Sequence, residues 1–173
     1  VGGSIIAPDG VDTELLVSFS KMVCKWLEEN KDGRLVFVAG GGAPARVYQN
    51  AYKAVASKFD DRQKAMLSFA SDDETNNACD WIGITATRLN AQILKTVFGP
   101  LCQQPVIIDP TKLCDFTGRV IVAAGWKPGF STDTDAVYLA EQFKADTVVN
   151  LSNIEKVYTD DPRKNPDAKP IDK

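Results

Sequence analysis

Apolar and polar residues follow two different periods along the chain, and these periods predict an ordered series of helices and strands. Over residues 12–29 the apolar side chains recur at helical spacing, as expected of a helix with one face against a core. Unbroken apolar runs at 35–39 and 120–124 are typical of parallel strands that are covered on both faces. The segments 105–108 and 147–151 are also predicted to be strands.

Helical patterns separate these predicted strands. Four further helices are expected, from 43 or 45 to 57, at 60–69, from 73 or 78 to 98, and at 134–144. An alternation of strands with helices is typical of an α/β domain with a mostly parallel sheet. Ligands of such open sheets bind beyond the carboxyl ends of the strands, so the loops that follow the strands are the places to look for a site.

Composition narrows the class of protein. A chain of 173 residues with 44% hydrophobic residues is long enough for one substantial core. Its formal net charge of -3 argues against nonspecific binding to nucleic acid. The chain has no histidine, which excludes histidine-based triads and metal sites. Its four cysteines form no Cys-x-x-Cys pair and are expected to be reduced thiols of a cytoplasmic protein. No apolar run reaches the length of a membrane span.

Glycines lie at three places where a strand is expected to lead into a helix. The segments are 1–4 (Val-Gly-Gly-Ser), 40–46 (Gly-Gly-Gly-Ala-Pro-Ala-Arg) and 125–133 (Gly-Trp-Lys-Pro-Gly-Phe-Ser-Thr-Asp). The unpaired N–H groups of a helix N-terminus suit a phosphate, and Arg46 can reach it from one turn into its helix. None of the three is a Walker A or a dinucleotide-binding pattern. The alternative for each is an ordinary turn with a capping side chain.

Five motifs then stand in a specific order. They are Gly-Gly-Ser at 2–4, Gly-Gly-Gly-x-x-x-Arg at 40–46, Asp-x-x-Gly-Ile-x-x-Thr-Arg-x-Asn-Ala at 80–91, Pro-Gly-Phe-Ser-Thr-Asp at 128–133 and Asn-x-x-x-Val-Tyr-Thr-x-Asp-Pro at 153–162. In this order they resemble the amino-acid kinase fold family and, within it, the archaeal-type UMP kinases. The block at 80–91 separates this group from its relatives.

The resemblance implies transfer of the γ-phosphoryl group of ATP to UMP, giving UDP for pyrimidine nucleotide biosynthesis, with Mg²⁺ bound to the nucleotide. The residues implied to contact ATP are Gly2, Gly3, Ser4, Gly42, Arg46, Ser152, Asn153, Tyr158 and Asp161. Those implied to contact UMP are Gly41, Asp80, Trp126, Lys127, Pro128, Gly129, Phe130, Ser131 and Thr132. Arg46 and Asp133 are implied near the reacting centre, and no side chain is assigned to a metal.

The resemblance also implies a single domain over residues 1–173, built as a three-layer α/β/α sandwich with a mostly parallel sheet. The chain is expected to lack the first residues of its first strand and a C-terminal part. The implied assembly is a cytoplasmic homohexamer of dimers that binds neither nucleic acid nor membrane.

Alternatives to this function remain open. One is another small-molecule kinase of the same fold, and the other is a nucleotide-binding or storage protein without catalysis. Glu155-Lys156, where the family usually has Asp-Gly, keeps the second alternative open. Single residues have simpler interpretations as well: Asp80 as a first-turn acid of a helix, Lys127 as a solvated loop lysine and Tyr158 as a core aromatic.

Overall fold

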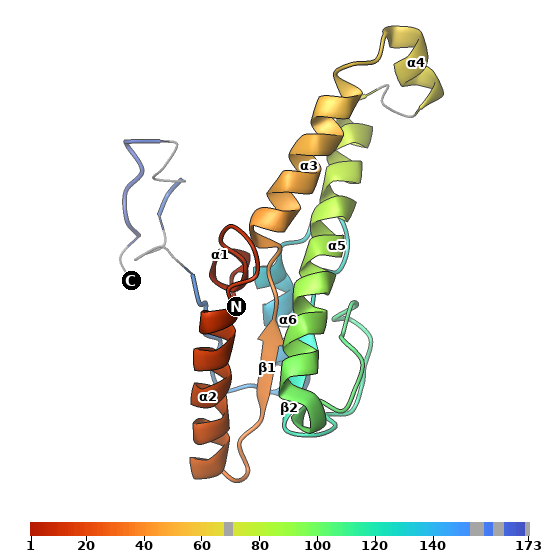
Figure 1. The fold of residues 1–173 in the computed structure, drawn as a ribbon. Helices are drawn as coiled ribbons and strands as arrows, with labels where there is room; N and C mark the ends of the chain where they lie inside the picture. The colour runs from red at the N-terminus through yellow and green to blue at the C-terminus, as the bar shows by residue number, and fades with distance from the viewer. Residues whose placement is uncertain (68–70, 153–157, 161–164, 172–173) are drawn as a thin grey trace.

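The computed structural model describes residues 1–67, 71–152, 158–160 and 165–171, and its elements are labelled in Figure 1. In chain order they are α1 (Gly3–Ile6), α2 (Thr13–Glu29), β1 (Leu35–Val38), α3 (Gly42–Ala56), α4 (Asp61–Met66), α5 (Asp72–Phe98), a short 3₁₀ helix η1 (Gly99–Leu101), β2 (Val120–Ala123) and α6 (Thr132–Phe143). Helices therefore make up most of the described regular structure, as the 3.6-residue periods predict.

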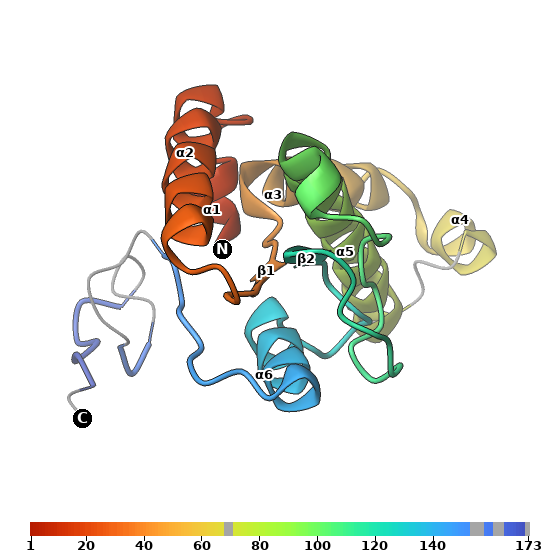
Figure 2. The same cartoon turned by 90° about the horizontal axis from the view of Figure 1, so that it is seen from below.

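The two strands pair in parallel, with Leu35 opposite Val120 and Val38 opposite Ala123. Figure 2 shows α6 on one face of this pair and α2 and α5 on the other. The continuous apolar composition of both strands follows from this arrangement, because each face of the pair meets a helical layer. All four residues of β2 are buried.

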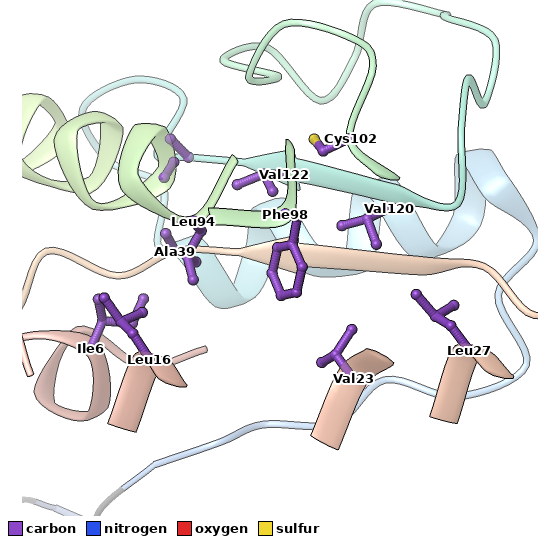
Figure 3. Close-up of a cluster of buried hydrophobic side chains, with 12 residues drawn as sticks. Ile6, Leu16, Val23, Leu27, Ala39, Leu94, Phe98, Cys102, Val120 and Val122 are labelled. Atoms are coloured by element: carbon purple, nitrogen blue, oxygen red, sulfur yellow. The ribbon is translucent and has the colours of Figure 1, made fainter. Parts of the chain in front are cut away.

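The larger core lies between the sheet and the helices α1, α2 and α5. Figure 3 shows its buried side chains, which are Ile6, Leu16, Val23, Leu27, Ala39, Ala91, Leu94, Phe98, Cys102, Val120, Val122 and Ala124. The Phe98 ring of α5 stacks on Phe37 of β1 at 5.3 Å between centroids and meets Phe19 of α2 edge-on at 6.2 Å. Burial of each such side chain stabilises the fold by about 1.5–3 kcal/mol, so this cluster holds α2 and α5 on the same face.

The smaller core lies on the opposite face and fixes α6. Leu139 of α6 is buried with Val38 and Ala123 at the ends of the two strands. The first turn of α6 begins at Ser131, whose hydroxyl oxygen accepts a hydrogen bond from the Thr134 N–H at 3.1 Å. Because this cap lies just beyond the end of β2, the loop between them is held close to the carboxyl edge of the sheet.

Helices α3 and α5 lie side by side and extend beyond the sheet, with α4 near their far ends (Figure 1). The helices α4 and α5 both begin beyond the sheet, and each has a side-chain cap at its start. Asp60 and Gln63 form a reciprocal capping box at α4, and Ser71 caps α5. Local capping therefore stabilises the far end of this helical pair, in addition to helix packing.

Two predicted strands are not strands in the structure. The segment 105–108 makes only a single bridge, between Ile107 and Ala123. Residues 147–151 pair with no strand, although the Leu151 carbonyl accepts a hydrogen bond from the Gly2 N–H at 2.7 Å. A groove of about 1160 Å³ lies between the outer edge of β1 and residues 144–149. Within the described residues, no helix is long and apolar enough to cross a membrane.

Candidate functional site

The carboxyl end of the sheet opens into a cavity of about 500 Å³ between α3, α5 and the loop that joins β2 to α6. Its lining residues are Gly41, Gly42, Ala45, Arg46, Gln49, Asp80, Gly83, Ile84, Thr87, Gly125, Lys127, Pro128, Gly129, Phe130, Ser131 and Thr132. Most residues that the sequence assigned to UMP thus line one cavity. We call residues 127–132 the acceptor loop and this space the acceptor cavity.

Asp80 ties the acceptor loop to α5. Its Oδ2 accepts a hydrogen bond from the Gly129 N–H at 3.3 Å, and the side chain is exposed on the cavity side. Gly129 has a φ of +83°, which a residue with a side chain rarely adopts. Asp80 is not a first-turn acid of α5, because this helix begins eight residues earlier, at Asp72, with Ser71 as its cap.

Positive charge collects around the same cavity. Arg46 of α3 and Lys127 of the acceptor loop both line it. Arg46 is exposed and forms no hydrogen bond or ion pair with any residue that the structure describes. The N-terminus of the 12-residue helix α6 also faces the cavity through Ser131 and Thr132. Two cationic side chains and the free N–H groups of a helix together make a place for an anion such as phosphate.

Three aromatic rings and a lysine group together at the start of the acceptor loop. The Trp126 and Phe130 rings lie 4.7 Å apart between centroids, and Tyr138 of α6 meets Trp126 edge-on at 6.2 Å. The Lys127 ammonium sits over the Trp126 ring at 3.9 Å and over Phe130 at 5.0 Å. This cation–π contact orders a lysine that the sequence alone could equally assign to a solvated loop.

The first two glycine loops, residues 1–4 and 40–46, pack against each other backbone to backbone beside the acceptor cavity. The Gly3 carbonyl oxygen and the Ala7 carbonyl oxygen both lie where a side chain at Gly42 would have to go. Gly42 also has a φ of +66°. The Ala43 N–H donates to the Ala7 carbonyl at 2.9 Å, and the Gly40 N–H donates to the Val1 carbonyl at 3.0 Å. Glycine is required here because the two backbones touch.

The amide of Asn90 fixes the second loop from α5. Its Nδ2 donates to the Gly40 carbonyl at 2.7 Å and to the Gly41 carbonyl at 3.1 Å. Asn90 is only 2% exposed, so its buried side-chain amide donates hydrogen bonds to the loop carbonyls and not to solvent. The Gly40 N–H is bonded to the Val1 carbonyl, whereas the N–H groups of Gly41 and Gly42 form no hydrogen bond with any residue that the structure describes.

The remaining predicted ATP-site residues divide into two sets. Gly2 lies against the backbone of Leu151 and Ser152, so Ser152 lies beside the first glycine loop. Asp133 is exposed at the start of α6. Tyr158 instead forms a short antiparallel bridge with Pro170. Figures 1 and 2 show this C-terminal segment to one side of the helices and sheet.

Some predicted residues lie outside the described part of the chain. They are Asn153, Asp161 and the pair Glu155-Lys156. Their roles remain predictions, as does that of Tyr158.

Sequence reasoning missed several residues around the acceptor cavity. They are Gln49, Thr87, Arg88 and Asn90, which contact the cavity or its loops, and Asp135 of α6. Thr87, Arg88 and Asn90 belong to the motif at 80–91, so that motif contained a signal for them. Asp135 is fully buried, and burial raises the pKa of its carboxyl above the ordinary value, opposed by a hydrogen bond from the Trp126 backbone.

Two packed glycine loops lie beside a cationic cavity, at the carboxyl edge of a parallel strand pair. This arrangement agrees with the protein family whose model matches the whole sequence. The chain belongs to the amino acid kinase family, matched over residues 1–173. This confirms the family and, with it, the amino-acid kinase fold; of the expected sandwich, the described residues show helices around a two-stranded parallel sheet.

Within that family the chain is similar to proteins named uridylate kinase. The protein of Pyrococcus abyssi is 34% identical over 176 residues, which cover 100% of this chain and 69% of that protein. The protein of Methanocaldococcus jannaschii is 31% identical, with coverage of 100% and 70%. The crystal structure of uridylate kinase from Archaeoglobus fulgidus superposes with a TM-score of 0.66 and 30% identity, covering 98% of this chain and 69% of that one.

Proposed function

We propose that the protein is a UMP kinase that transfers the γ-phosphoryl group of ATP to UMP. The observation that carries the proposal is the acceptor cavity, which combines a carboxylate at its mouth with two cationic side chains and a helix N-terminus. A nucleoside monophosphate presents a ribose diol and a phosphate, and these groups match that set of residues. The similarity to uridylate kinases over the full chain selects UMP among nucleoside monophosphates.

The acceptor would bind with its ribose at Asp80 and its phosphate toward Arg46 and the start of α6. A carboxylate accepts hydrogen bonds from both hydroxyls of a ribose, and an arginine fork binds phosphate oxygens in pairs. Trp126 and Phe130 offer aromatic faces to the base, and Lys127 adds a charge that can move from its ring contacts to the phosphate. The other acceptor contacts come from Gly41, Pro128, Gly129, Ser131 and Thr132.

The donor would bind along the two packed glycine loops. Backbone N–H groups of Gly3 and Gly42 suit the phosphates of ATP, because neighbouring amides can form an anion-binding nest. Gly2, whose own N–H donates to the Leu151 carbonyl, would border the same phosphates. We assign the hydroxyls of Ser4 and Ser152 to the same phosphates; the proximity of the Ser152 backbone to Gly2 supports the second assignment. Asn153, Tyr158 and Asp161 complete our assignment for the donor, and the substrate is ATP with its Mg²⁺.

Phosphoryl transfer needs two phosphates in line and neutralisation of the charge that develops between them. Gly41 and Gly42 lie between the acceptor cavity and the donor loops, and Arg46 starts one turn beyond them. We assign Arg46 to the transferring phosphoryl group and Asp133 to the metal-bound nucleotide on the donor side. These two residues are the catalytic residues of the proposal.

Substrate profiling tests this function directly. The intact protein is incubated with Mg–ATP, and ADP release is followed with UMP, CMP, GMP, acetylglutamate, aspartate and carbamate as acceptors. UMP is expected to give the highest kcat/KM. A higher kcat/KM with an amino acid or carbamate would reassign the chain to another kinase of the fold, and tight nucleotide binding without ADP release would make it a binding protein.

The architecture and assembly belong to the same proposal. Helices on both faces of a parallel strand pair support a full α/β/α sandwich over residues 1–173. Exposed apolar side chains on α3, namely Val47 at 63% and Val55 at 52%, support self-association into a homohexamer of dimers. The four free cysteines support a cytoplasmic location.

A further inference from the structure

The peptide that leads from β2 into the acceptor loop is held entirely by side chains. The Gly125 N–H donates to Thr87 Oγ1 at 2.8 Å, and the Trp126 N–H donates to Asp135 Oδ2 at 3.2 Å. Both carbonyls accept from Arg88 Nη2, at 3.5 Å for Gly125 and 3.1 Å for Trp126. All four backbone polar groups of this dipeptide therefore have side-chain partners, which replace those that a neighbouring strand would supply.

The partners come from helices on opposite faces of the sheet. Thr87 and Arg88 belong to α5, whereas Asp135 belongs to α6 (Figure 2). The Thr87 hydroxyl also donates to the Ile84 carbonyl at 2.6 Å, which fixes the orientation of its oxygen. The Arg88 guanidinium lies over the Trp81 ring at 5.9 Å. The two partners on α5 are thus themselves oriented by a second contact.

The buried carboxyl group of Asp135 lowers the stability of the fold unless its bond to the Trp126 N–H has a function. It is 0% exposed, and its Oδ1 has no hydrogen-bond partner among the described residues. A buried carboxyl group costs stability when it is not fully paired. Helix α6 does not need it as a cap, because Ser131 already performs that role. The Trp126 N–H is the one hydrogen-bond donor to this carboxyl among the described residues.

The dipeptide controls the side chains around the acceptor cavity. Trp126 carries the ring that contacts Phe130 and Lys127, and the acceptor loop begins at the next residue. A shift of the Trp126 backbone would therefore move the aromatic faces and the lysine together. The donor loops are fixed by other bonds, from Asn90 and Ala7.

We propose that Asp135 and Arg88 are positioning residues that hold Trp126, and with it the acceptor loop, in the geometry that binds the acceptor nucleotide. The proposal rests on the proposed function for the identity of that nucleotide. Removal of either partner should weaken the acceptor site and leave the donor site unchanged.

Steady-state kinetics of four variants test the positioning role. Asp135→Ala removes the acceptor for the Trp126 N–H, and we expect KM for UMP to rise tenfold or more while KM for ATP stays within twofold. Asp135→Asn keeps an oxygen for this bond and should restore KM for UMP to within threefold of the parent. Arg88→Met removes the α5 donor to the Gly125 and Trp126 carbonyls and should reproduce the effect of Asp135→Ala. Val137→Ala, on the exposed side of α6, is the matched control.

A second measurement separates this proposal from the function on which it rests. The three tryptophans are labelled as 5-fluorotryptophan and assigned by Trp→Phe substitution, so that Trp126 is followed by ¹⁹F NMR without any substrate. Asp135→Ala should shift or broaden the Trp126 resonance and leave that of Trp26 unchanged, and Asp135→Asn should restore it. This result without UMP phosphorylation would refute only the proposed function.

Two results would contradict the positioning role. An unchanged Trp126 resonance in Asp135→Ala, in a protein that does phosphorylate UMP, would overturn it. Equal increases of KM for UMP and ATP would do the same. If Asp135→Ala does not fold, the same criteria apply to Arg88→Met.

Discussion

Asp80 lies at the mouth of the acceptor cavity with one carboxylate oxygen bonded to the Gly129 N–H. Its second oxygen is left for a ligand, and the proposed ligand is the ribose of UMP. One residue thus shapes the loop and offers a hydrogen-bond acceptor to the substrate. A substitution that keeps the first bond but removes the charge separates these two roles.

Asp80→Asn is expected to weaken UMP with little effect on ATP. The amide oxygen can still accept from Gly129, so the loop keeps its shape. Loss of a charge-assisted hydrogen bond costs about 1.5–3 kcal/mol, or roughly a tenfold to 150-fold rise in Kd for UMP. Calorimetric titration with each nucleotide measures this difference. A larger loss for ATP than for UMP would place Asp80 on the donor side.

Arg46→Lys is expected to lower turnover by tenfold or more while the protein stays folded. Lysine keeps the charge but loses the planar fork that binds two phosphate oxygens, and each tenfold in rate corresponds to about 1.4 kcal/mol of barrier. The matched control is Arg62→Lys on α4, an exposed arginine that does not line the acceptor cavity. Turnover and thermal melting are measured on both. Unchanged turnover in Arg46→Lys would remove this residue from the site.

Motif order predicted most of the acceptor cavity but not the residues that hold it. Asp80, Arg46 and the acceptor loop are recognisable because each stands in a motif of fixed spacing. Asp135 stands in an apolar helix pattern, and its role depends on a bond to Trp126, nine residues away and beyond a loop. Such a bond depends on how the loop folds back onto the helix, which no local pattern records.

At the scale of elements, the helices follow from local sequence, whereas only two of the four predicted strands form. The helices α2, α3 and α5 begin or end close to their predicted limits because caps and amphipathic spacing are local properties. Strand 35–39 was recognised by its unbroken apolar run. The segment 147–151 (Thr-Val-Val-Asn-Leu) is also rich in β-branched residues but is not a strand, because a strand exists only where another strand pairs with it.

The stack of Phe19, Phe37 and Phe98 joins α2, β1 and α5, so it is the point where elements depend on one another. Phe98→Ala is expected to lower the free energy of unfolding by about 3–5 kcal/mol, since the residue is only 3% exposed. Val97→Ala, with Val97 46% exposed, is the control and should cost far less. Urea unfolding measures both. Equal losses would mean that the ring stack does not hold these elements together.

At the scale of the whole molecule, α3 presents apolar side chains to solvent along one stripe. Val47, Ala51 and Val55 are spaced four residues apart and are all exposed. A contiguous apolar stripe of this kind on a helix is typical of an association surface. A second copy of the chain is the partner in our proposal, and the stripe gives that proposal a place on the surface.

The double variant Val47→Glu/Val55→Glu is expected to shift the protein toward smaller species, because burying these charges in an apolar contact costs several kcal/mol. Light scattering after size-exclusion chromatography measures the molar mass. The control is Val17→Glu on α2, where Val17 is 54% exposed but lies on another helix. An assembly with the same molar mass as the parent would show that the stripe is not part of an interface.

The dipeptide at 125–126 has a consequence for how this protein can change its substrate. Its position depends on backbone groups bonded to α5 and α6 and not on the identity of the side chains that follow. Substitutions at Trp126, Lys127 and Phe130 can therefore alter the shape, charge and aromatic character of the acceptor cavity while the backbone keeps its path. Replacing these three side chains is therefore expected to change which acceptor the protein prefers, without insertions, deletions or a new loop conformation.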